Sequence, residues 1–176
     1  MFRSRIASEE DIPVIMEVME AAITENMKPF LSAEEIIAAR ETMGLDRSLI
    51  RDGTYFLIEA DDGRIAGCGG WGKRRTLYGG DQAGWRDDSL SDPAVDAARI
   101  RAMYTHPDFT RRGVGTLLLD LGESAARDAG FRCIELGSTI AGEALYRARG
   151  YTEFHREAMT GANGLVKTVI HMRKLL

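Results

Sequence analysis

Alternation of apolar and polar residues predicts a strand from Ala98 to Tyr104. Its two predicted faces carry Ile100, Ala102 and Tyr104 on one side and Arg99, Arg101 and Met103 on the other. Pro107 ends the pairing of this strand, because proline has no N–H to donate. Beyond it, apolar residues recur at helical spacing, at Val114, Leu117, Leu118, Leu121 and Ala125. The middle of the chain is therefore predicted to be a strand, a loop and an amphipathic helix.

The residues before this unit predict two helices and a hairpin. Serine-led capping boxes at Ser8–Asp11 and Ser32–Glu35 each precede apolar residues at helical spacing. Two strand-like runs follow, Tyr55–Ala60 and Ile65–Cys68, joined by the turn-forming sequence Asp61–Arg64.

The residues after the unit predict a further strand and a short helix. Gly130-Phe131 ends the amphipathic helix, and Cys133–Leu136 has the composition of a short strand. A helical segment over Ala144–Tyr151 is stopped by Gly150.

The loop from His106 to Thr116 has the chemistry of an anion site. Gly113–Thr116 opens a helix, whose first N–H groups lack internal partners and whose dipole is positive at that end. Arg111 and Arg112 add cationic donors suited to phosphate oxygens. This combination predicts a pyrophosphate site, and the alternative is an arginine pair on a solvated loop.

Two other phosphate-binding motifs fit this chain less well. A Walker A loop needs lysine followed by serine or threonine at the helix start, where this chain has Thr116 and Leu117. A literal G-x-G-x-x-G occurs at Gly67–Gly72, but it leads into Lys73–Thr76 instead of an apolar helix. A nucleotide-binding enzyme built on Gly67–Gly72 is therefore a disfavoured alternative.

Composition favours one domain over residues 1–176. A chain of 176 residues with 44% hydrophobic content can bury a single sizeable core. The net charge of −4 argues against a nucleic-acid-binding protein. Cys68 and Cys133 form no C-x-x-C pair, so we expect neither a disulfide framework nor a zinc site. The N-terminal residues hold no long apolar stretch, so we expect a cytoplasmic protein without a membrane span.

Four motifs in order resemble the GNAT superfamily of acetyl-CoA-dependent N-acetyltransferases. They are Arg112-Gly113-Val114-Gly115, Gly130-Phe131, the strand containing Ile134 and Leu136, and Tyr146-x-x-x-Gly150-Tyr151. The resemblance covers Ala98–Tyr151 well and the preceding elements more loosely. It implies an α/β fold with a mixed, mostly antiparallel sheet flanked by helices. The sheet would splay between the strands near 98–105 and 133–138 to hold acetyl-CoA.

The resemblance also implies a division of the single domain and a set of cofactor contacts. Acceptor-side helices and a hairpin would occupy about 1–97, the acetyl-CoA core about 98–151, and C-terminal strands about 152–176. The pantetheine arm would pair with backbone groups of Met103, Tyr104 and Thr105. The pyrophosphate would be held by Arg111, Arg112, Gly113, Val114, Gly115 and Thr116. Thr110 and Thr139 depart from the family pattern, and Thr139 would contact the pantetheine through its hydroxyl where the family often has asparagine.

Tyr146 is implied as the general acid. A phenol with a pKa near about 10 can protonate a departing thiolate with a pKa near about 8.5 while remaining neutral itself. An acceptor amine would attack the thioester directly, a backbone N–H near Met103–Thr105 would stabilise the oxyanion, and neither a metal nor a covalent enzyme intermediate would take part. Taken alone, without the loop at His106–Thr116, Tyr146 is better interpreted as a core aromatic residue of a short helix.

The acceptor is a small-molecule or peptide amine that the sequence does not identify. The long connection over residues 73–97 is a candidate substrate loop, and Trp71, Tyr78 and Trp85 are candidate walls of an amine pocket. Candidate general bases, none preferred, are Glu59, Asp81, His106, Glu135 and Glu143.

Two further possibilities stay open at this point. A non-catalytic acyl-CoA-binding or interaction module with the same fold is the main alternative to an enzyme. By analogy with related proteins, the alternating segment Val166–Met172 is a candidate edge for a homodimer.

Overall fold

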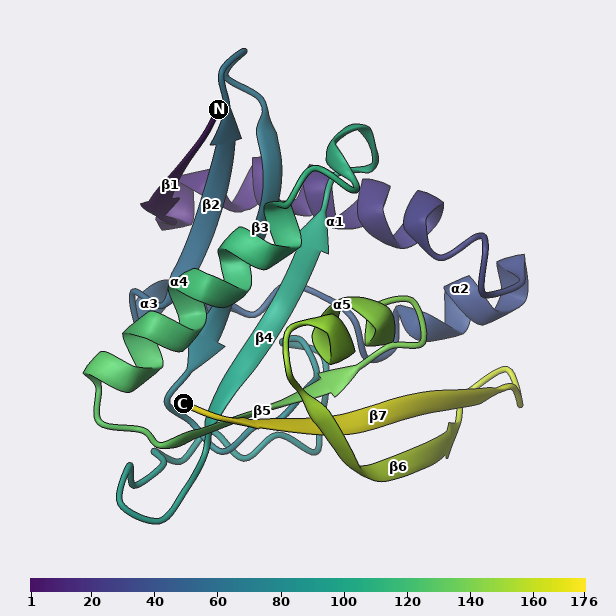
Figure 1. Cartoon of the computed structure of the whole chain (residues 1–176). Coiled ribbons are helices and arrows are strands. Elements are labelled where there is room, and N and C mark those ends of the chain that lie inside the picture. Colours follow the sequence, from purple (N-terminus) through teal and green to yellow (C-terminus); the bar gives the residue numbers. More distant parts are fainter.

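Seven strands form one sheet in the computed structural model, which describes residues 1–176 (Figure 1). In chain order they are β1 (Phe2–Ile6), β2 (Tyr55–Ala60), β3 (Ile65–Gly72), β4 (Ala98–Thr105), β5 (Cys133–Ser138), β6 (Thr152–Thr160) and β7 (Val166–Leu175). Their order across the sheet is β1-β2-β3-β4-β5-β7-β6, and only the β4–β5 pair is parallel. The predicted mixed, mostly antiparallel sheet is therefore confirmed.

Five helices accompany the sheet: α1 (Ile12–Asn26), α2 (Ala33–Ala39), α3 (Arg47–Arg51), α4 (Val114–Asp128) and α5 (Glu143–Ala148). The second predicted capping box is present, because Ser32 Oγ accepts from the Glu35 N–H at 3.2 Å while Glu35 accepts from the Ser32 N–H at 2.7 Å. Helix α3 was not predicted. It has only five residues, and a segment of that length carries too few turns to show helical periodicity.

Helices cover both faces of the sheet, so the protein has two hydrophobic clusters. Leu118 and Leu119 of α4 pack with Ile100 on one face. Ile15 and Val18 of α1, with Tyr104, belong to the cluster on the other face. In Figure 1, α4 lies in front of the sheet and α1 behind it.

A bulge in β4 corrects the predicted alternation of that strand. Between its pairing partners Gly70 and Cys68, β3 moves by two residues. Over the same stretch β4 moves by three residues, from Arg101 to Tyr104. Ala102 takes φ of 50°, which is unusual for a residue with a side chain. The extra residue reverses the alternation, so Ile100 and Tyr104 enter opposite clusters and do not share a face as predicted.

The sheet opens between β4 and β5. These strands pair only at Ala98 with Ile134 and at Arg99 with Glu135. Beyond that point they diverge, and Figure 1 shows α5 beside the opening. The predicted splay between residues 98–105 and 133–138 is thus observed.

The glycine-rich motif Gly67–Gly72 lies within β3 and is buried. A Cβ on Gly67 would meet Val114 Cγ1 at 2.5 Å, and one on Gly70 would meet the Thr54 carbonyl oxygen at 2.3 Å. These glycines permit close packing of α4 and β2 against β3. They form no loop that a dinucleotide would approach.

Candidate functional site

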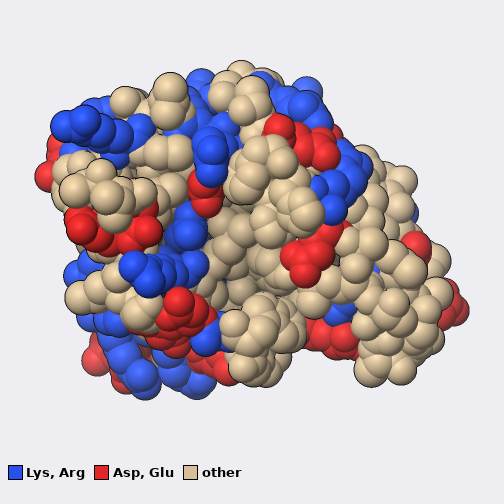
Figure 2. Space-filling model, turned by 90° about the horizontal axis from the view of Figure 1, so that it is seen from below, with Lys and Arg blue, Asp and Glu red and all other residues tan.

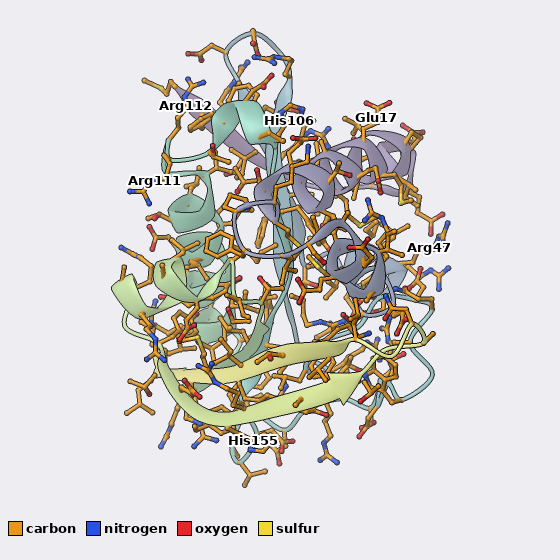
Figure 3. All side chains as sticks on the ribbon, turned by 90° about the vertical axis from the view of Figure 1, so that its right-hand side faces the viewer. Glu17, Arg47, His106, Arg111, Arg112 and His155 are labelled. Atoms are coloured by element: carbon orange, nitrogen blue, oxygen red, sulfur yellow. The ribbon has the colours of Figure 1, made fainter.

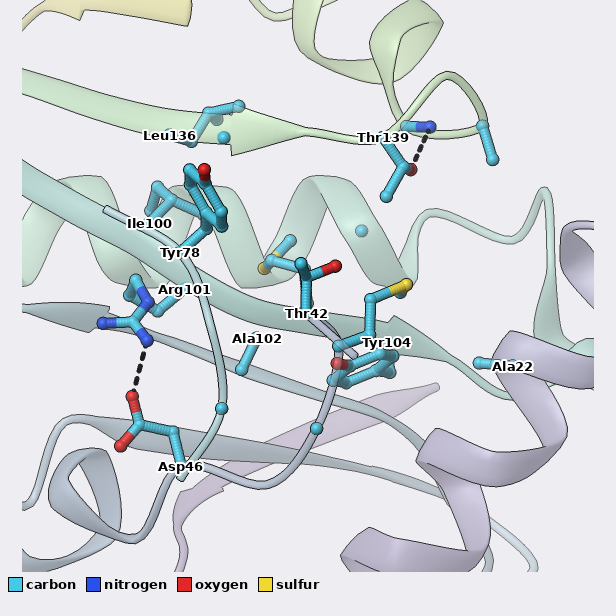
Figure 4. Close-up of a pocket in the computed structure, with 18 of the residues that line it drawn as sticks. Ala22, Thr42, Asp46, Tyr78, Ile100, Arg101, Ala102, Tyr104, Leu136 and Thr139 are labelled. Atoms are coloured by element: carbon cyan, nitrogen blue, oxygen red, sulfur yellow. Dashed lines mark hydrogen bonds and ion pairs between the residues drawn. The ribbon is translucent and has the colours of Figure 1, made fainter. Parts of the chain in front are cut away.

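A cleft of about 270 Å³ occupies the opening between β4 and β5 (Figure 4). One end is lined by the second half of β4, by the start of α4 and by the segment that leads into α5. The C-terminal part of α1 reaches this end too, where Asn26 bonds to Thr105, and the other end is lined by two loop segments, residues 42–46 and 77–80. We call these the β4–α4 end and the loop end.

Backbone groups of Met103, Tyr104 and Thr105 line the β4–α4 end. Two side chains fix the backbone at the two ends of this stretch, at Ala102 and at Thr105. Tyr55 donates its hydroxyl proton to the Ala102 carbonyl at 2.9 Å, and Asn26 Nδ2 donates to the Thr105 carbonyl at 2.7 Å. Because β5 has turned away, this part of β4 has no neighbouring strand on the cleft side, and a ligand can take that place.

The start of α4 leaves a row of backbone donors without partners. The N–H groups of Gly113, Val114, Gly115 and Thr116 make no hydrogen bond within the chain. Gly113 has φ of 87° and turns the backbone into the helix. A Cβ on Gly115 would meet Leu145 Cδ2 at 2.7 Å, so this glycine permits α5 to lie against the start of α4.

The two predicted arginines differ in environment. The Arg112 guanidinium lies 5.0 Å from the ring centre of Phe109 and 5.5 Å from that of Phe2, in cation–π geometry. Arg111 is exposed, takes φ of 60° and extends away from the loop in Figure 3. Arg111 therefore has no aromatic or acidic partner in the chain, whereas Arg112 lies against two rings.

Tyr146 lies on α5 and lines the β4–α4 end of the cleft. Its ring packs edge-on against Tyr151 with centroids 5.9 Å apart. Burial raises the pKa of the Tyr146 phenol to about 12, and no protein group hydrogen-bonds to its hydroxyl. The neighbouring Thr139 lines the same wall, and its Oγ1 accepts from the Gly142 N–H at 3.2 Å. The phenol is thus protonated and without a protein partner.

The loop end is held by a buried ion pair that sequence reasoning missed. Arg101 Nη2 donates to Asp46 Oδ2 at 2.7 Å, and the two side chains are 5% and 0% exposed. Arg101 also donates to the carbonyls of Thr76 and Gly79 at 3.2 and 2.7 Å. Arg86 adds a contact of 3.1 Å to Asp46 Oδ1. These bonds tie the segment of residues 73–97 to β4 and to the chain before α3.

Of the three aromatic residues predicted to wall an amine pocket, only Tyr78 lines the cleft. Trp71 is buried in the core edge-on to Phe131, since β3 turns it toward α4. Trp85 is half exposed and packs on Tyr78 from outside, with ring centres 6.1 Å apart.

None of the five predicted general bases lines the cleft. Each is occupied elsewhere: Glu59 by Arg5, Asp81 by Arg47, Glu135 by Arg99, Glu143 by Arg147, and His106 by the Asp108 N–H. The structure brings no carboxylate other than Asp46 to this cleft, and Arg101 neutralises that one.

A family model described as the acetyltransferase (GNAT) family matches residues 17–151. The chain belongs to this family. The match extends well N-terminal of the motifs between Ala98 and Tyr151 that first indicated it, and takes in most of α1. No curated protein sequence matches the chain significantly.

Solved structures of N-acetyltransferases share this fold. A GCN5-related N-acetyltransferase from Rhodopseudomonas palustris superposes with a TM-score of 0.71 at 22% identity, covering 99% of this chain and 95% of that one. PaiA N-acetyltransferase from Thermoplasma acidophilum, solved with coenzyme A, gives 0.62 at 15% identity over 100% and 99% of the two chains. YncA of Salmonella typhimurium, a putative acetyltransferase solved with acetyl-CoA, gives 0.66 at 19% identity over 100% and 94%.

Two further properties of the structure concern membranes and metals. No helix is both long and apolar enough to cross a bilayer. No group of three or more histidine, cysteine, aspartate or glutamate side chains is arranged to hold a metal ion.

Proposed function

We propose that this GNAT-family protein transfers the acetyl group of acetyl-CoA to a primary amine. The observation that carries the proposal is the cleft at the splayed β4–β5 edge, which holds an unpartnered phenol and reaches, at Gly115, the row of four unpartnered N–H groups at the start of α4. In this proposal the domain divides as its sequence suggests. Residues 98–151 bind the donor, and residues before 98 build most of the acceptor side.

Acetyl-CoA binds along β4 and at the start of α4. The pyrophosphate accepts hydrogen bonds from the N–H groups of Gly113, Val114, Gly115 and Thr116, where the helix dipole favours an anion. Arg111 adds charge, while Arg112 shapes the loop through its aromatic contacts. The pantetheine arm takes the place beside Met103–Thr105 that β5 leaves open, and reaches Thr139 on the other wall. Two related structures were solved with coenzyme A or acetyl-CoA, which supports this choice of donor.

Transfer is a direct attack. The amine nitrogen forms a bond to the thioester carbon, a backbone N–H of Met103–Thr105 donates to the carbonyl oxygen as it becomes negative, and the C–S bond then breaks. The thiolate takes the phenolic proton of Tyr146, and the proton lost by the amine restores the phenol by way of solvent. Because the pKa of Tyr146 is about 12, this phenol keeps its proton throughout the neutral and mildly alkaline range.

Calorimetry and a thiol-release assay test the proposal. Acetyl-CoA is expected to bind the wild-type protein in preference to NAD, and free thiol is expected to appear only when an amine is added. Tyr146→Phe is expected to lower kcat by about 10²-fold between about pH 7 and pH 10, with the acetyl-CoA Kd unchanged within about twofold. Unchanged kcat in this variant would remove Tyr146 from the mechanism.

Tyr151→Phe is the matched control. Its ring touches that of Tyr146, but its hydroxyl donates to Glu123 at 3.0 Å and has no role in the transfer. Tyr151→Phe is expected to lower stability and to leave most of kcat. Acetyl-CoA binding without thiol release from any amine would favour a non-catalytic acyl-CoA-binding module, whereas failure to bind acetyl-CoA would overturn the donor assignment.

A further inference from the structure

The loop end of the cleft brings few charges toward an acceptor. Among all residues that line the cleft, Asp46 and Arg101 alone are charged, and they are paired with each other. The other lining groups at this end are small, apolar or neutral, and include Thr42, Met43 and Gly80. An acceptor therefore enters a cavity that offers hydrogen bonds and apolar surface but no free ion.

Asp46 is not available to bind a cationic substrate. Its carboxylate accepts from Arg101 at 2.7 Å, from Arg86 at 3.1 Å and from the Ser48 N–H at 3.0 Å, and its side chain is 0% exposed. Arg86 also contacts Asp88 at 2.9 Å, so the charges of this corner are engaged with one another. A second ammonium placed near it would have to compete with these guanidinium groups for the carboxylate.

Two carboxylates just outside the cleft already have partners, a lysine for Glu41 and two neutral or titratable groups for Glu157. Glu41 holds the Lys167 ammonium at 2.8 Å, and Glu157 accepts from the Tyr78 hydroxyl at 2.9 Å and lies 3.1 Å from His171 Nε2. Figure 2 shows the same tendency on one face of the molecule, where charges of both signs stand side by side around an uncharged recess. The carboxylate oxygens of Glu41 and Glu157 are therefore engaged by groups of the chain, and neither residue lines the cleft.

Tyr78 adds an aromatic surface to this end of the cleft. Its hydroxyl is already bound by Glu157, and its ring lies against Gly137 of β5, where an added Cβ would meet Tyr78 Cδ1 at 3.1 Å. The loop that carries Tyr78 is fixed by Arg101 at Gly79. The wall is consequently held in place and is suited to an apolar substrate body.

We propose, on the basis of the acetyl transfer proposed above, that the acceptor carries one amine on an otherwise uncharged, largely apolar body. A second cation would lose its hydration in the cleft without gaining a carboxylate, which is unfavourable. The same surroundings favour the reacting amine in its neutral form, because burial lowers the pKa of an ammonium group. Polyamines and other polycationic amines are therefore excluded as acceptors.

Matched pairs of amines test this assignment with acetyl-CoA at saturation. The pairs are hexylamine and 1,6-diaminohexane, 4-methylphenethylamine and 4-(aminomethyl)phenethylamine, and alanyl-norleucinamide and alanyl-lysinamide. Each pair keeps one skeleton and adds one cation. In the skeleton that the enzyme accepts, kcat/KM is expected to be at least about 10-fold lower for the dicationic member, which corresponds to about 1.4 kcal/mol. Equal or higher kcat/KM for the dicationic member overturns the assignment.

A designed change of charge gives a second measurement. Thr42 lines the loop end and is labelled in Figure 4. Thr42→Asp adds a carboxylate there. It is expected to reduce or reverse the ratio of kcat/KM for the monocationic amine to kcat/KM for its dicationic partner. Thr42→Asn, of similar size but uncharged, is expected to leave the ratio within about twofold whatever the absolute rate. A ratio that shifts equally in both variants would contradict the electrostatic explanation.

Failure of the two proposals can be told apart. If acetyl-CoA binds but no amine with an uncharged body is acetylated, the acceptor assignment is wrong and the donor site stands. If acetyl-CoA does not bind, the proposed function is wrong and the acceptor assignment falls with it.

Discussion

The two ends of the cleft are built in different ways. At the β4–α4 end, the groups offered to a ligand belong mainly to the backbone of two segments that are close in sequence, Met103–Thr105 and Gly113–Thr116. At the loop end, the walls are held by the Asp46–Arg101 pair, whose partners are 55 residues apart. One end depends on local conformation and the other on long-range side-chain contacts.

This difference makes the two ends respond differently to changes of side chain. Backbone N–H groups and a glycine turn are independent of most side chains, so the β4–α4 end can keep its geometry when other residues change. A wall held by a few buried side chains can change with single substitutions. We therefore expect the loop end to respond to mutation through stability and the β4–α4 end through donor affinity.

Asp46→Ala is expected to have the largest effect, because it leaves Arg101 buried without its carboxylate. Breaking one side of a buried ion pair typically costs about 3–5 kcal/mol. We expect a loss of this size in the free energy of unfolding, measured by urea denaturation. The fraction that remains folded should keep its acetyl-CoA affinity, because the donor groups lie at the other end.

The double variant Asp46→Ala/Arg101→Met is the control for this prediction. Removal of both charges removes the unpaired cation, so the double variant should be more stable than Asp46→Ala alone. A loss below about 1 kcal/mol in Asp46→Ala would mean that the pair contributes little to the loop end.

Gly115→Val is expected to act on the donor instead. Its side chain would meet Leu145 of α5 and crowd the unpartnered N–H groups at the start of α4. We expect the acetyl-CoA Kd to rise by about 10-fold or more, equivalent to about 1.4 kcal/mol, in calorimetric titrations. Gly84→Val is the matched control, since nothing lies within 4 Å of a Cβ at Gly84. An equal Kd in both variants would count against a pyrophosphate at this turn.

Gly113→Ala is expected to have a smaller effect that comes from the backbone alone. Gly113 has φ of 87° with open space around its Cβ position, so alanine meets no steric contact but must adopt a left-handed conformation. The expected loss of stability is about 1–2 kcal/mol. Gly113→Asn should lose less, because asparagine tolerates this region better. Equal losses in the two variants would point to a cause other than φ.

The sequence predicts the β4–α4 end well because its signals are local. The predicted loop lies between β4 and α4, and α4 begins at Val114, inside the predicted helix start Gly113–Thr116. The family match confirms the resemblance that these motifs indicated. The roles of Tyr146 and of the loop donors remain predictions that the variants above test.

The loop end was beyond sequence reasoning for two physical reasons. Arg101 alternates with apolar residues in the sequence, as an exposed side chain of a strand would. The bulge at Ala102 reverses the alternation of β4, and no glycine in the strand indicates it. Asp46 stands in a polar stretch before a five-residue helix, and no pattern in one sequence pairs it with a residue on β4. Long-range ion pairs of this kind require the folded chain.

Thr105→Val is expected to have the smallest effect, because it tests whether the β4–α4 end depends on a side chain at all. The proposed donor contact at this position uses the backbone, whose carbonyl is held by Asn26 at 2.7 Å, while the threonine hydroxyl makes no hydrogen bond in the chain. Valine has nearly the same shape and a strong preference for strands. We expect the acetyl-CoA Kd to stay within about twofold of wild type in calorimetry. A loss of about 10-fold would show that the hydroxyl takes part in donor binding, and this wall would then depend on side chains as the loop end does.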